Sequence, residues 1–269
     1  MRIISGRQNP AVRVFRSLAS STDVTGERVL LDGVHLVREA REAGTAFEIV
    51  AIASSRLARE TEEGLLAHAL ERDGVDVVMA PDQLFGIISP VRTPSGIIAV
   101  ARRRPAVPAE ISARPDALTL AAVDIQDPGN LGSLLRAAEA GGVTGVLVCG
   151  TPGHGSANPF SWKALRGSMG SALRLPVVTG LPAGQIMTEM HQAGMRTVAS
   201  VARGGSDPDH VSWKGRVGLW VGGEGPGLAH DLVERCDERV TIPMAPQVES
   251  LNAAVAGALL VYAARRQRS

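Results

Sequence analysis

The sequence predicts an α/β protein of two domains, and three observations predict this class. Strand-like apolar segments alternate with helix-like amphipathic segments along both halves of the chain. A proline-rich linker at 105–116 separates the halves. The segment 118–123 is apolar without interruption, which is typical of a strand buried on both faces of a parallel sheet. We therefore expect a first domain at 1–104 and a second, mainly parallel one at 117–269.

In the first domain, the opening helix is recognised by Val12, Phe15 and Leu18, which recur on one helical face. Short runs rich in Val, Ile and Leu between turn residues indicate strands. The predicted helices are 10–18, 33–43, 60–72 and 82–88, and the predicted strands are 29–31, 47–53, 75–79 and 97–101.

The second domain continues the same alternation. The predicted strands are 118–123, 145–149, 196–201, 217–221 and 238–242, and the predicted helices are 131–140, 159–170, 184–193, 228–235 and 250–267. The last helix carries Leu251, Val255, Leu259 and Tyr262 on one face.

The balance of charge excludes a globally basic nucleic-acid-binding protein. Lys and Arg number 28 against 27 Asp and Glu, so any contact with nucleic acid must use a local patch. Only Lys163 and Lys214 are lysines, and the excess of Arg suits phosphate recognition. GC-rich codon usage is the simpler explanation of that excess. Aromatic residues make up 3%, too few for an aromatic surface that stacks RNA bases.

No targeting, membrane or metal-binding signal stands out in the sequence. The N-terminal residues lack a long apolar run, and the longest apolar stretch, 253–264, is too short to span a bilayer. Cys149, Cys236 and the six histidines show no metal-ligand spacing. We expect a cytoplasmic protein with free thiols, without a membrane segment or a metal.

Three polar segments of the second half follow predicted strands, and ligands of open parallel sheets bind beyond the carboxyl ends of strands. The first segment, 127–136, begins with turn residues, places Asn130 as a suitable helix N-cap and ends on Arg136. Arg136 either reinforces an anion site at the helix N-terminus or forms a surface ion pair with Glu139. The segment alone favours neither role.

The other two segments, 222–228 and 242–253, are ambiguous when each is read alone. The glycine-rich one fails the G-x-G-x-x-G dinucleotide pattern, because Leu228 and His230 occupy the positions that require glycine. Its glycines still let a backbone approach a ligand closely, while Glu224 reads more simply as a solvated acid. In the last segment, Ser250 and Asn252 fit ordinary helix-start roles.

Together the three segments are far more specific. They contain N-x-G-x-x-x-R at Asn130, Gly132 and Arg136, then G-x-E-x-x-G at Gly222, Glu224 and Gly227, then I-P-M at 242–244 and S-L-N at 250–252. This order and spacing resembles the SpoU (TrmH-like) family of S-adenosylmethionine-dependent RNA ribose 2′-O-methyltransferases, in the SPOUT superfamily. Segments 5–10, 31–37 and 94–100 resemble, more weakly, the family's L30e-like substrate-binding domain, although Asp32 stands where the family usually has Glu.

The resemblance implies a trefoil-knotted α/β methyltransferase domain at 117–269, with an L30e-like RNA-binding domain at 1–104. It implies a homodimer with the active site across the interface, RNA as substrate, and S-adenosylmethionine as cofactor. No DNA or membrane partner is implied. Carried over residue by residue, the cofactor contacts fall at Gly222, Ile242 and Leu251, and the catalytic positions are Asn130, Arg136, Glu224, Ser250 and Asn252.

The two-domain form favours 23S ribosomal RNA as the substrate. The alternatives are ribose methylation of tRNA, a non-catalytic ribosome-assembly protein of the same fold, and methylation of a base. The family assigns the role of base to the arginine at Arg136. Because a guanidinium stays protonated, we favour a cation that holds phosphate and stabilises developing alkoxide.

For RNA docking, the sequence offers Arg7, Arg13 and Arg16 near its start and a basic triplet, Arg102 to Arg104, before the linker. An ordinary solvated linker explains the triplet equally well.

Overall fold

The computed structural model describes residues 1–20 and 27–268, and the chain folds into two compact units. The N-terminal unit comprises residues 1–104 and 160–173, and the C-terminal unit comprises 105–159 and 174–269. The first stretch of the N-terminal unit ends at Arg104, and the domain boundaries expected from the sequence stay predictions. The expected second domain, 117–269, is interrupted, however, because 160–173 returns to the N-terminal unit.

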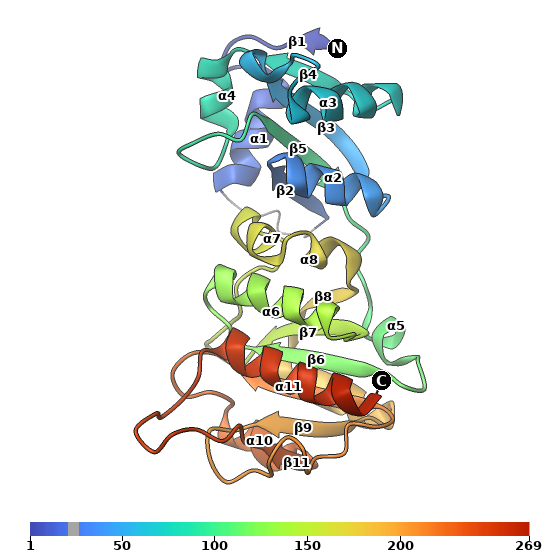
Figure 1. Ribbon diagram of the computed structural model, residues 1–269, viewed down its shortest axis with the longest axis vertical. Helices are drawn as coiled ribbons and strands as arrows, with labels where there is room; N and C mark the ends of the chain where they lie inside the picture. Colours follow the sequence, from blue (N-terminus) through green and yellow to red (C-terminus); the bar gives the residue numbers. More distant parts are fainter. Residues whose placement is uncertain (21–26, 269) are drawn as a thin grey trace. The chain divides into compact units, whose positions relative to one another are not determined.

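The N-terminal unit contains a five-stranded mixed sheet in the order β1-β4-β3-β5-β2 (Figure 1). β5 is antiparallel to both of its neighbours, whereas β1, β4 and β3 are parallel. The strands are β1 (Arg2–Ile3), β2 (Arg28–Asp32), β3 (Ala46–Ala53), β4 (Val77–Ala80) and β5 (Ile97–Arg102). The two-residue strand β1 is too short to produce the alternation that identifies a strand in sequence.

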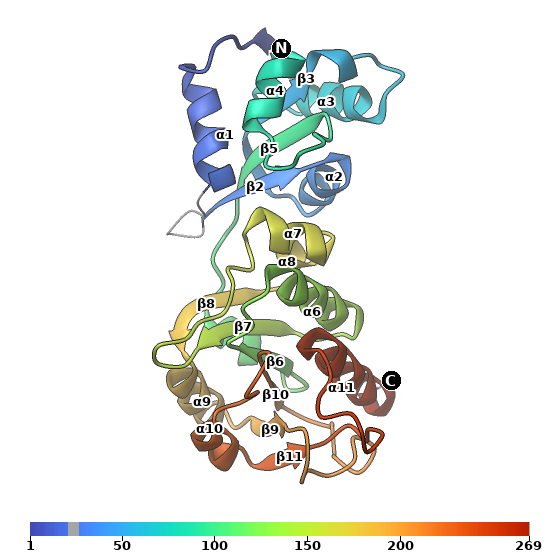
Figure 2. The same cartoon turned by 90° about the vertical axis from the view of Figure 1, so that its left-hand side faces the viewer.

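Helices cover both faces of this sheet, α1 and α4 on one face and α2 and α3 on the other (Figure 2). Phe15 of α1 lies with Phe85 and Ile88 of α4 in one buried cluster. The helices are α1 (Pro10–Ser20), α2 (Val34–Glu42), the short 3-10 turn η1 (Ser54–Arg56), α3 (Glu62–Arg72) and α4 (Asp82–Ile88).

The returning segment 160–173 carries α7 (Trp162–Ser168), and α8 (Ser171–Arg174) follows at its end. Ser161 caps α7, since its hydroxyl accepts a hydrogen bond from the backbone N–H of Ala164 at 3.3 Å. Met169 and Gly170 then adopt left-handed backbone angles, which end the helix. The helix predicted over 159–170 is therefore confirmed as the shorter α7, and the sequence does not predict α8 beyond it.

The C-terminal unit contains a six-stranded sheet in the order β11-β9-β10-β6-β7-β8, and all neighbouring strands are parallel. Every residue of β6 is buried, as its uninterrupted apolar sequence predicts. The strands are β6 (Leu118–Val123), β7 (Gly145–Gly150), β8 (Val177–Pro182), β9 (Arg196–Ser200), β10 (Val217–Gly222) and β11 (Glu238–Val240). β8 escapes prediction because Gly180 and Pro182 disfavour a strand in sequence.

Two helical layers enclose this sheet, with α6 and α11 on one face and α9 and α10 on the other (Figure 2). Part of the expected linker is a docked helix, because buried Ile111 of α5 packs directly over Gly145 of β7. The helices are α5 (Pro108–Ser112), α6 (Pro128–Ala140), α9 (Ala183–Gln192), α10 (His230–Arg235) and α11 (Ala253–Arg268).

The face of α11 that packs on the unit is not the large apolar face seen in the sequence. Its buried residues are mostly Ala and Gly, and a Cβ on Gly257 would lie 2.3 Å from Leu134 of α6. This close approach requires small residues. Val255, Leu259 and Tyr262 therefore point away from the unit and are 48%, 49% and 46% exposed.

Within the described residues, every helix is too short or too polar to cross a membrane.

Candidate active site

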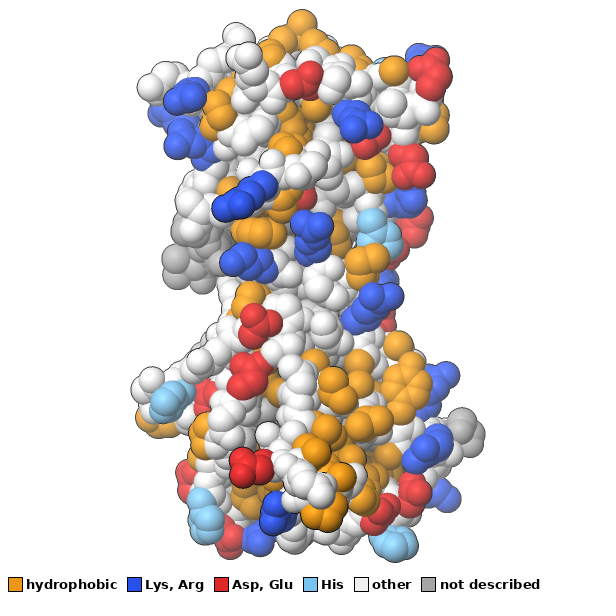
Figure 3. Space-filling view, turned by 60° about the vertical axis from the view of Figure 1, so that its left-hand side comes forward, with side chains coloured by type: hydrophobic (Ala, Val, Ile, Leu, Met, Phe, Trp, Pro, Cys, Tyr) orange, Lys and Arg blue, Asp and Glu red, His pale blue; other side chains and the backbone are white. Residues whose placement is uncertain are grey.

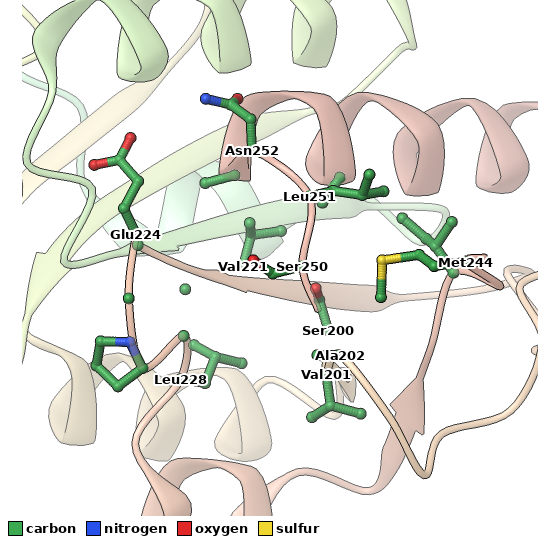
Figure 4. Close-up of a pocket in the computed structure, with 18 residues that line it drawn as sticks. Ser200, Val201, Ala202, Val221, Glu224, Leu228, Met244, Ser250, Leu251 and Asn252 are labelled. Carbon is green, nitrogen blue, oxygen red and sulfur yellow. The ribbon is translucent and has the colours of Figure 1, made fainter. Parts of the chain in front are cut away.

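Two of the three polar segments line one cavity at the carboxyl end of the C-terminal sheet (Figure 4), and the third is hydrogen-bonded to them through Asn130. The cavity has a volume of about 350 Å³. The glycine-rich loop 222–228 forms one wall, and the segment from Ile242 to Ala256 forms another. Gly222, Glu224, Ile242, Ser250, Leu251 and Asn252 all line it, so most of the residues predicted for the site lie together.

A chain of hydrogen bonds joins the three segments. The side-chain amide of Asn252 donates to Oδ1 of Asn130 at 3.1 Å, and Nδ2 of Asn130 donates to the carboxylate of Glu224. Asn130 is 94 positions from Glu224 and 122 positions from Asn252 in the sequence. Each amide thus uses both its donor and its acceptor, which fixes the orientation of both side chains and of the carboxylate.

Local backbone structure places the two asparagines. Asp127, and not Asn130, is the N-cap of α6: its carboxylate accepts from the backbone N–H of Asn130 at 2.7 Å. The predicted N-cap role of Asn130 is therefore wrong, and its side chain is left to reach Glu224. Asn252 bonds the first turn of α11, because its Oδ1 accepts from the N–H groups of Ala254 and Val255.

The glycines of the loop are explained by close backbone contacts. A Cβ on Gly222 would lie 2.3 Å from the carbonyl carbon of Gly227, and a Cβ on Gly223 would lie 1.9 Å from the carbonyl oxygen of Asp124. Gly225 and Gly227 have φ angles of 96° and 70°. The loop thus turns back on itself and presents Glu224 at its tip, without a dinucleotide fingerprint.

Arg136 does not join this constellation within one chain. It lies on the exposed side of α6, does not line the cavity, and has no hydrogen bond or ion pair with any described residue. The alternative ion pair with Glu139 is also wrong, because Glu139 is held by Arg174 through two hydrogen bonds of 2.7 Å.

Part of the cavity is formed by residues outside the three polar segments. Ser200, Val201 and Ala202, at the end of β9, form a further wall, together with Met244 and Leu228 (Figure 4). β9 pairs with β10 in parallel, so its carboxyl end lies beside the glycine-rich loop. The same rule on strand ends could have identified these residues, but their side chains carry no distinctive chemistry.

Neither cysteine is a candidate nucleophile. Burial raises the pKa of the Cys149 thiol to about 12 and that of Cys236 to about 12, so both stay protonated at neutral pH. No group of three or more His, Cys, Asp or Glu side chains that could hold a metal occurs among the described residues.

Two arginines of the basic triplet make contacts within the N-terminal unit. Arg102 forms an ion pair with Glu48, and the guanidinium of Arg103 stacks 3.5 Å from the ring centre of Phe160. Burial lowers the pKa of Arg103 to about 10. Arg102 belongs to β5 and not to a solvated linker, but Arg102 and Arg104 are exposed, and contact of the triplet with RNA stays a prediction.

Comparison with known proteins agrees with the constellation of motifs. The model of the SpoU rRNA Methylase family matches residues 117–262, slightly more than half of the chain. The chain belongs to this family. The resemblance inferred from the motifs is thereby confirmed, as is an α/β fold with a parallel sheet. The trefoil knot stays a prediction.

Three known proteins, one compared by sequence and two by structure, match nearly the whole chain. The Bacillus subtilis (strain 168) protein named 23S rRNA (guanosine(2553)-2′-O)-methyltransferase RlmP is 31% identical over 97% of this chain and 98% of its own length. AviRb from Streptomyces viridochromogenes, a SpoU methyltransferase solved in complex with AdoMet, has a TM-score of 0.82 at 28% identity, covering 97% of this chain and 99% of AviRb. An AdoMet-bound rRNA methyltransferase from Sinorhizobium meliloti has a TM-score of 0.84 at 24% identity, covering 98% of this chain and 97% of that one. At this identity the similarity shows a shared fold.

Proposed function

We propose that this SpoU-family protein transfers a methyl group from S-adenosylmethionine to a ribose 2′-OH of 23S ribosomal RNA. The observation that carries the proposal is the hydrogen-bonded convergence of Asn130, Glu224 and Asn252 at one cavity. The reaction and RNA printed for the Bacillus subtilis relative, and the AdoMet bound to AviRb, support it. A cytoplasmic location would follow from such a substrate.

The residues of the cavity fit S-adenosylmethionine. Its volume lies within the range of small-molecule sites, and Leu228, Met244 and Leu251 offer apolar contact for an adenine ring. Glu224 is the sole charged side chain among the described residues that line it, and a carboxylate favours a sulfonium cation nearby. Backbone groups of Gly222, Ile242 and Leu251 would hold the cofactor.

When bound, S-adenosylmethionine supplies an electrophilic methyl group. The protein must then align a poor nucleophile, the ribose 2′-OH, and hold it while the proton leaves. We assign this alignment to Asn130, Glu224, Ser250 and Asn252, which lie at or beside the cavity. Arg136 would hold the RNA phosphate and stabilise negative charge on the reacting oxygen.

Arg136 would reach the site from a second copy of the chain. It is exposed and outside the cavity of its own chain. The exposed apolar stripe of α11, formed by Val255, Leu259 and Tyr262, offers a surface for such a homodimer. Figure 3 shows hydrophobic side chains gathered on one face of the C-terminal unit, in the lower half of the view.

The N-terminal unit would dock the RNA. Several Lys and Arg side chains are exposed on the face of this unit shown in Figure 3. Arg13 and Arg16 lie on α1, where they line an open depression with Ser17 and Ser20. Such a surface would contact phosphates without reading sequence.

Isothermal titration with S-adenosylmethionine tests the donor, and transfer of a radiolabelled methyl group to 23S rRNA from cells lacking this gene tests the reaction. We expect micromolar binding and label in an alkali-resistant 2′-O-methylated dinucleotide. Absence of binding would favour the non-catalytic assembly protein. Label on a base would indicate a base methyltransferase instead. Label found solely in tRNA, in a parallel reaction, would indicate ribose methylation of tRNA instead.

A further inference from the structure

A second cavity opens at the same edge of the C-terminal sheet, where β7 and β8 end. It has a volume of about 530 Å³ and is lined by the loop from Thr151 to Pro159 and by Thr179 to Pro182. The loop that follows β7 and the end of β8 belong to one compact unit. Nothing in the proposed methyl transfer uses these residues.

An irregularity of the sheet opens this cavity. Val148 of β7 pairs with Thr179 of β8, but Gly150 pairs with Pro182, so β8 has one residue more than β7 over this stretch. Gly180 takes up the extra residue with a φ of 83°, and a Cβ built on it would meet nothing within 4 Å. A bulge of this kind redirects an edge strand and is common beside functional sites.

The wall opposite the bulge is held rigidly. The carboxylate of Asp124 accepts hydrogen bonds from the backbone N–H of Thr151 at 3.1 Å and from its hydroxyl at 2.7 Å. Gly150 lets the loop fold back, since a Cβ there would lie 2.8 Å from the carbonyl oxygen of His154. The cavity is therefore preorganised, and the nearby carboxylate charge is covered by two donors.

The same loop is tied to the segment that carries Asn130. The hydroxyl of Ser156 accepts from the backbone N–H of Ile125 at 3.0 Å, and the N–H of Ala157 donates to the carbonyl of Ile125 at 2.7 Å. Ile125 precedes Asn130 by five residues, a span of at most about 17 Å. A few nucleotides of single-stranded RNA cover that distance.

The lining indicates the class of ligand. Among the described residues, it contains no Lys, Arg, Asp or Glu, and His154, its one basic side chain, is exposed. It combines hydroxyl and amide groups of Thr179 and Asn158 with the flat apolar rings of Pro152, Pro159 and Pro182. A phosphate would find no fixed cation here, whereas an uncharged, planar, hydrogen-bonding group is well matched.

We propose that this second cavity binds a nucleobase of the RNA substrate, a few nucleotides from the methylated ribose, and so selects the position that is modified. The inference rests on the proposed function. Binding of the base holds the RNA strand against the rigid loop 151–159, and this loop positions the RNA relative to Asn130.

The test places a large side chain at the opening of the second cavity. We compare the wild-type protein with Thr179→Trp and with a matched control, Thr188→Trp, at an exposed threonine of α9 outside both cavities. We expect Thr179→Trp to raise KM for 23S rRNA about tenfold, the size of a lost base-stacking contact. Affinity for S-adenosylmethionine should stay within twofold in all three proteins.

An unchanged KM in a folded Thr179→Trp protein overturns the inference while leaving the proposed function intact. Failure of the wild-type protein to methylate RNA overturns both. Photocrosslinking of wild-type protein to 4-thiouridine-substituted rRNA needs no variant and covers the case of a misfolded one. We expect crosslinks on 150–159 or 177–182, and crosslinks confined to other segments contradict the proposal.

Discussion

At the scale of single residues, the position of Glu224 decides how the three motifs work together. Its carboxylate ends the hydrogen-bond chain that begins at the first turn of α11 and passes through both asparagines. Glu224→Gln keeps the size and an acceptor oxygen but removes the charge. We expect kcat to fall by about ten- to a hundredfold, as for the loss of one charge-assisted contact in the transition state.

The measurement is single-turnover methyl transfer, together with thermal unfolding. Glu249→Gln is the matched control, since Glu249 lies in the neighbouring segment but outside the lining of the cavity. An equal loss of rate in both variants would show that Glu224 has no specific role.

The spacing of the motifs predicts which residues meet, but not how each is used. Six of the eight predicted site residues line the cavity, and Asn130 is bonded to its rim. Helix propensity makes Asn130 a good cap, yet Asp127 occupies that place because Pro128 starts the helix earlier. Arg136 lies outside the cavity of its own chain, which the spacing of the motifs does not predict.

At the scale of elements, a row of charges joins three neighbouring strands of the N-terminal sheet. Glu48 of β3 bonds Arg28 of β2, and it also pairs with Arg102 of β5, which lies between them. The hydrogen bond from Arg28 is the main reason that the pKa of Glu48 is lowered. The carboxylate therefore stabilises the unit above its ordinary pKa, and this contribution is lost as the pH falls through the lowered pKa.

We expect Glu48→Gln to reduce stability at pH 7 by about 1 kcal/mol, a modest value because both arginines are partly exposed. Thermal unfolding of the two proteins from pH 7 to pH 3 measures this difference. The melting temperatures should converge at the acidic end. A difference that persists undiminished there would exclude the charge as its cause.

The last helix, α11, predicts the state of assembly. Its apolar stripe is exposed within the chain, so Leu259→Asp should leave the fold of the single chain intact while dissociating a homodimer. Sedimentation equilibrium measures the effect. Leu65→Asp on α3 is the control, because Leu65 is a comparably exposed leucine in the other unit. A monomeric wild-type protein would contradict the dimer outright.

Elements with a strong pattern are predictable, and those set by packing are not. Runs of apolar residues identify β6 and β10, whereas the bulged β8 and the two-residue β1 have no pattern to detect. On α11 the hydrophobic periodicity is real, but the close packing of Gly257 against α6 selects the opposite face for burial.

At the scale of the whole molecule, mixing two impaired variants tests whether Arg136 acts on the partner's site. In a mixed dimer of Arg136→Ala and Glu224→Gln chains, one site contains an intact Glu224 and receives an intact arginine from the other chain. Random pairing should therefore restore about a quarter of the wild-type rate. Either variant alone should stay at or below about a tenth of the wild-type rate.

The rate of RNA methylation after co-refolding the two proteins is the measurement. No recovery in a mixture proven to contain mixed dimers would assign Arg136 to the site of its own chain.

The path of the chain between its two units has a practical consequence. The polypeptide passes from one unit to the other after Arg104, after Pro159 and after Leu173. A truncated gene that starts at the linker would still encode α7, whose buried Leu165 would have lost the strand β2 against which α7 packs. Dividing this enzyme at the linker would thus yield one fragment in which α7 exposes its apolar face and another in which β2 has lost the helix that packs on it. Neither fragment would be a suitable substitute for the intact chain in functional assays.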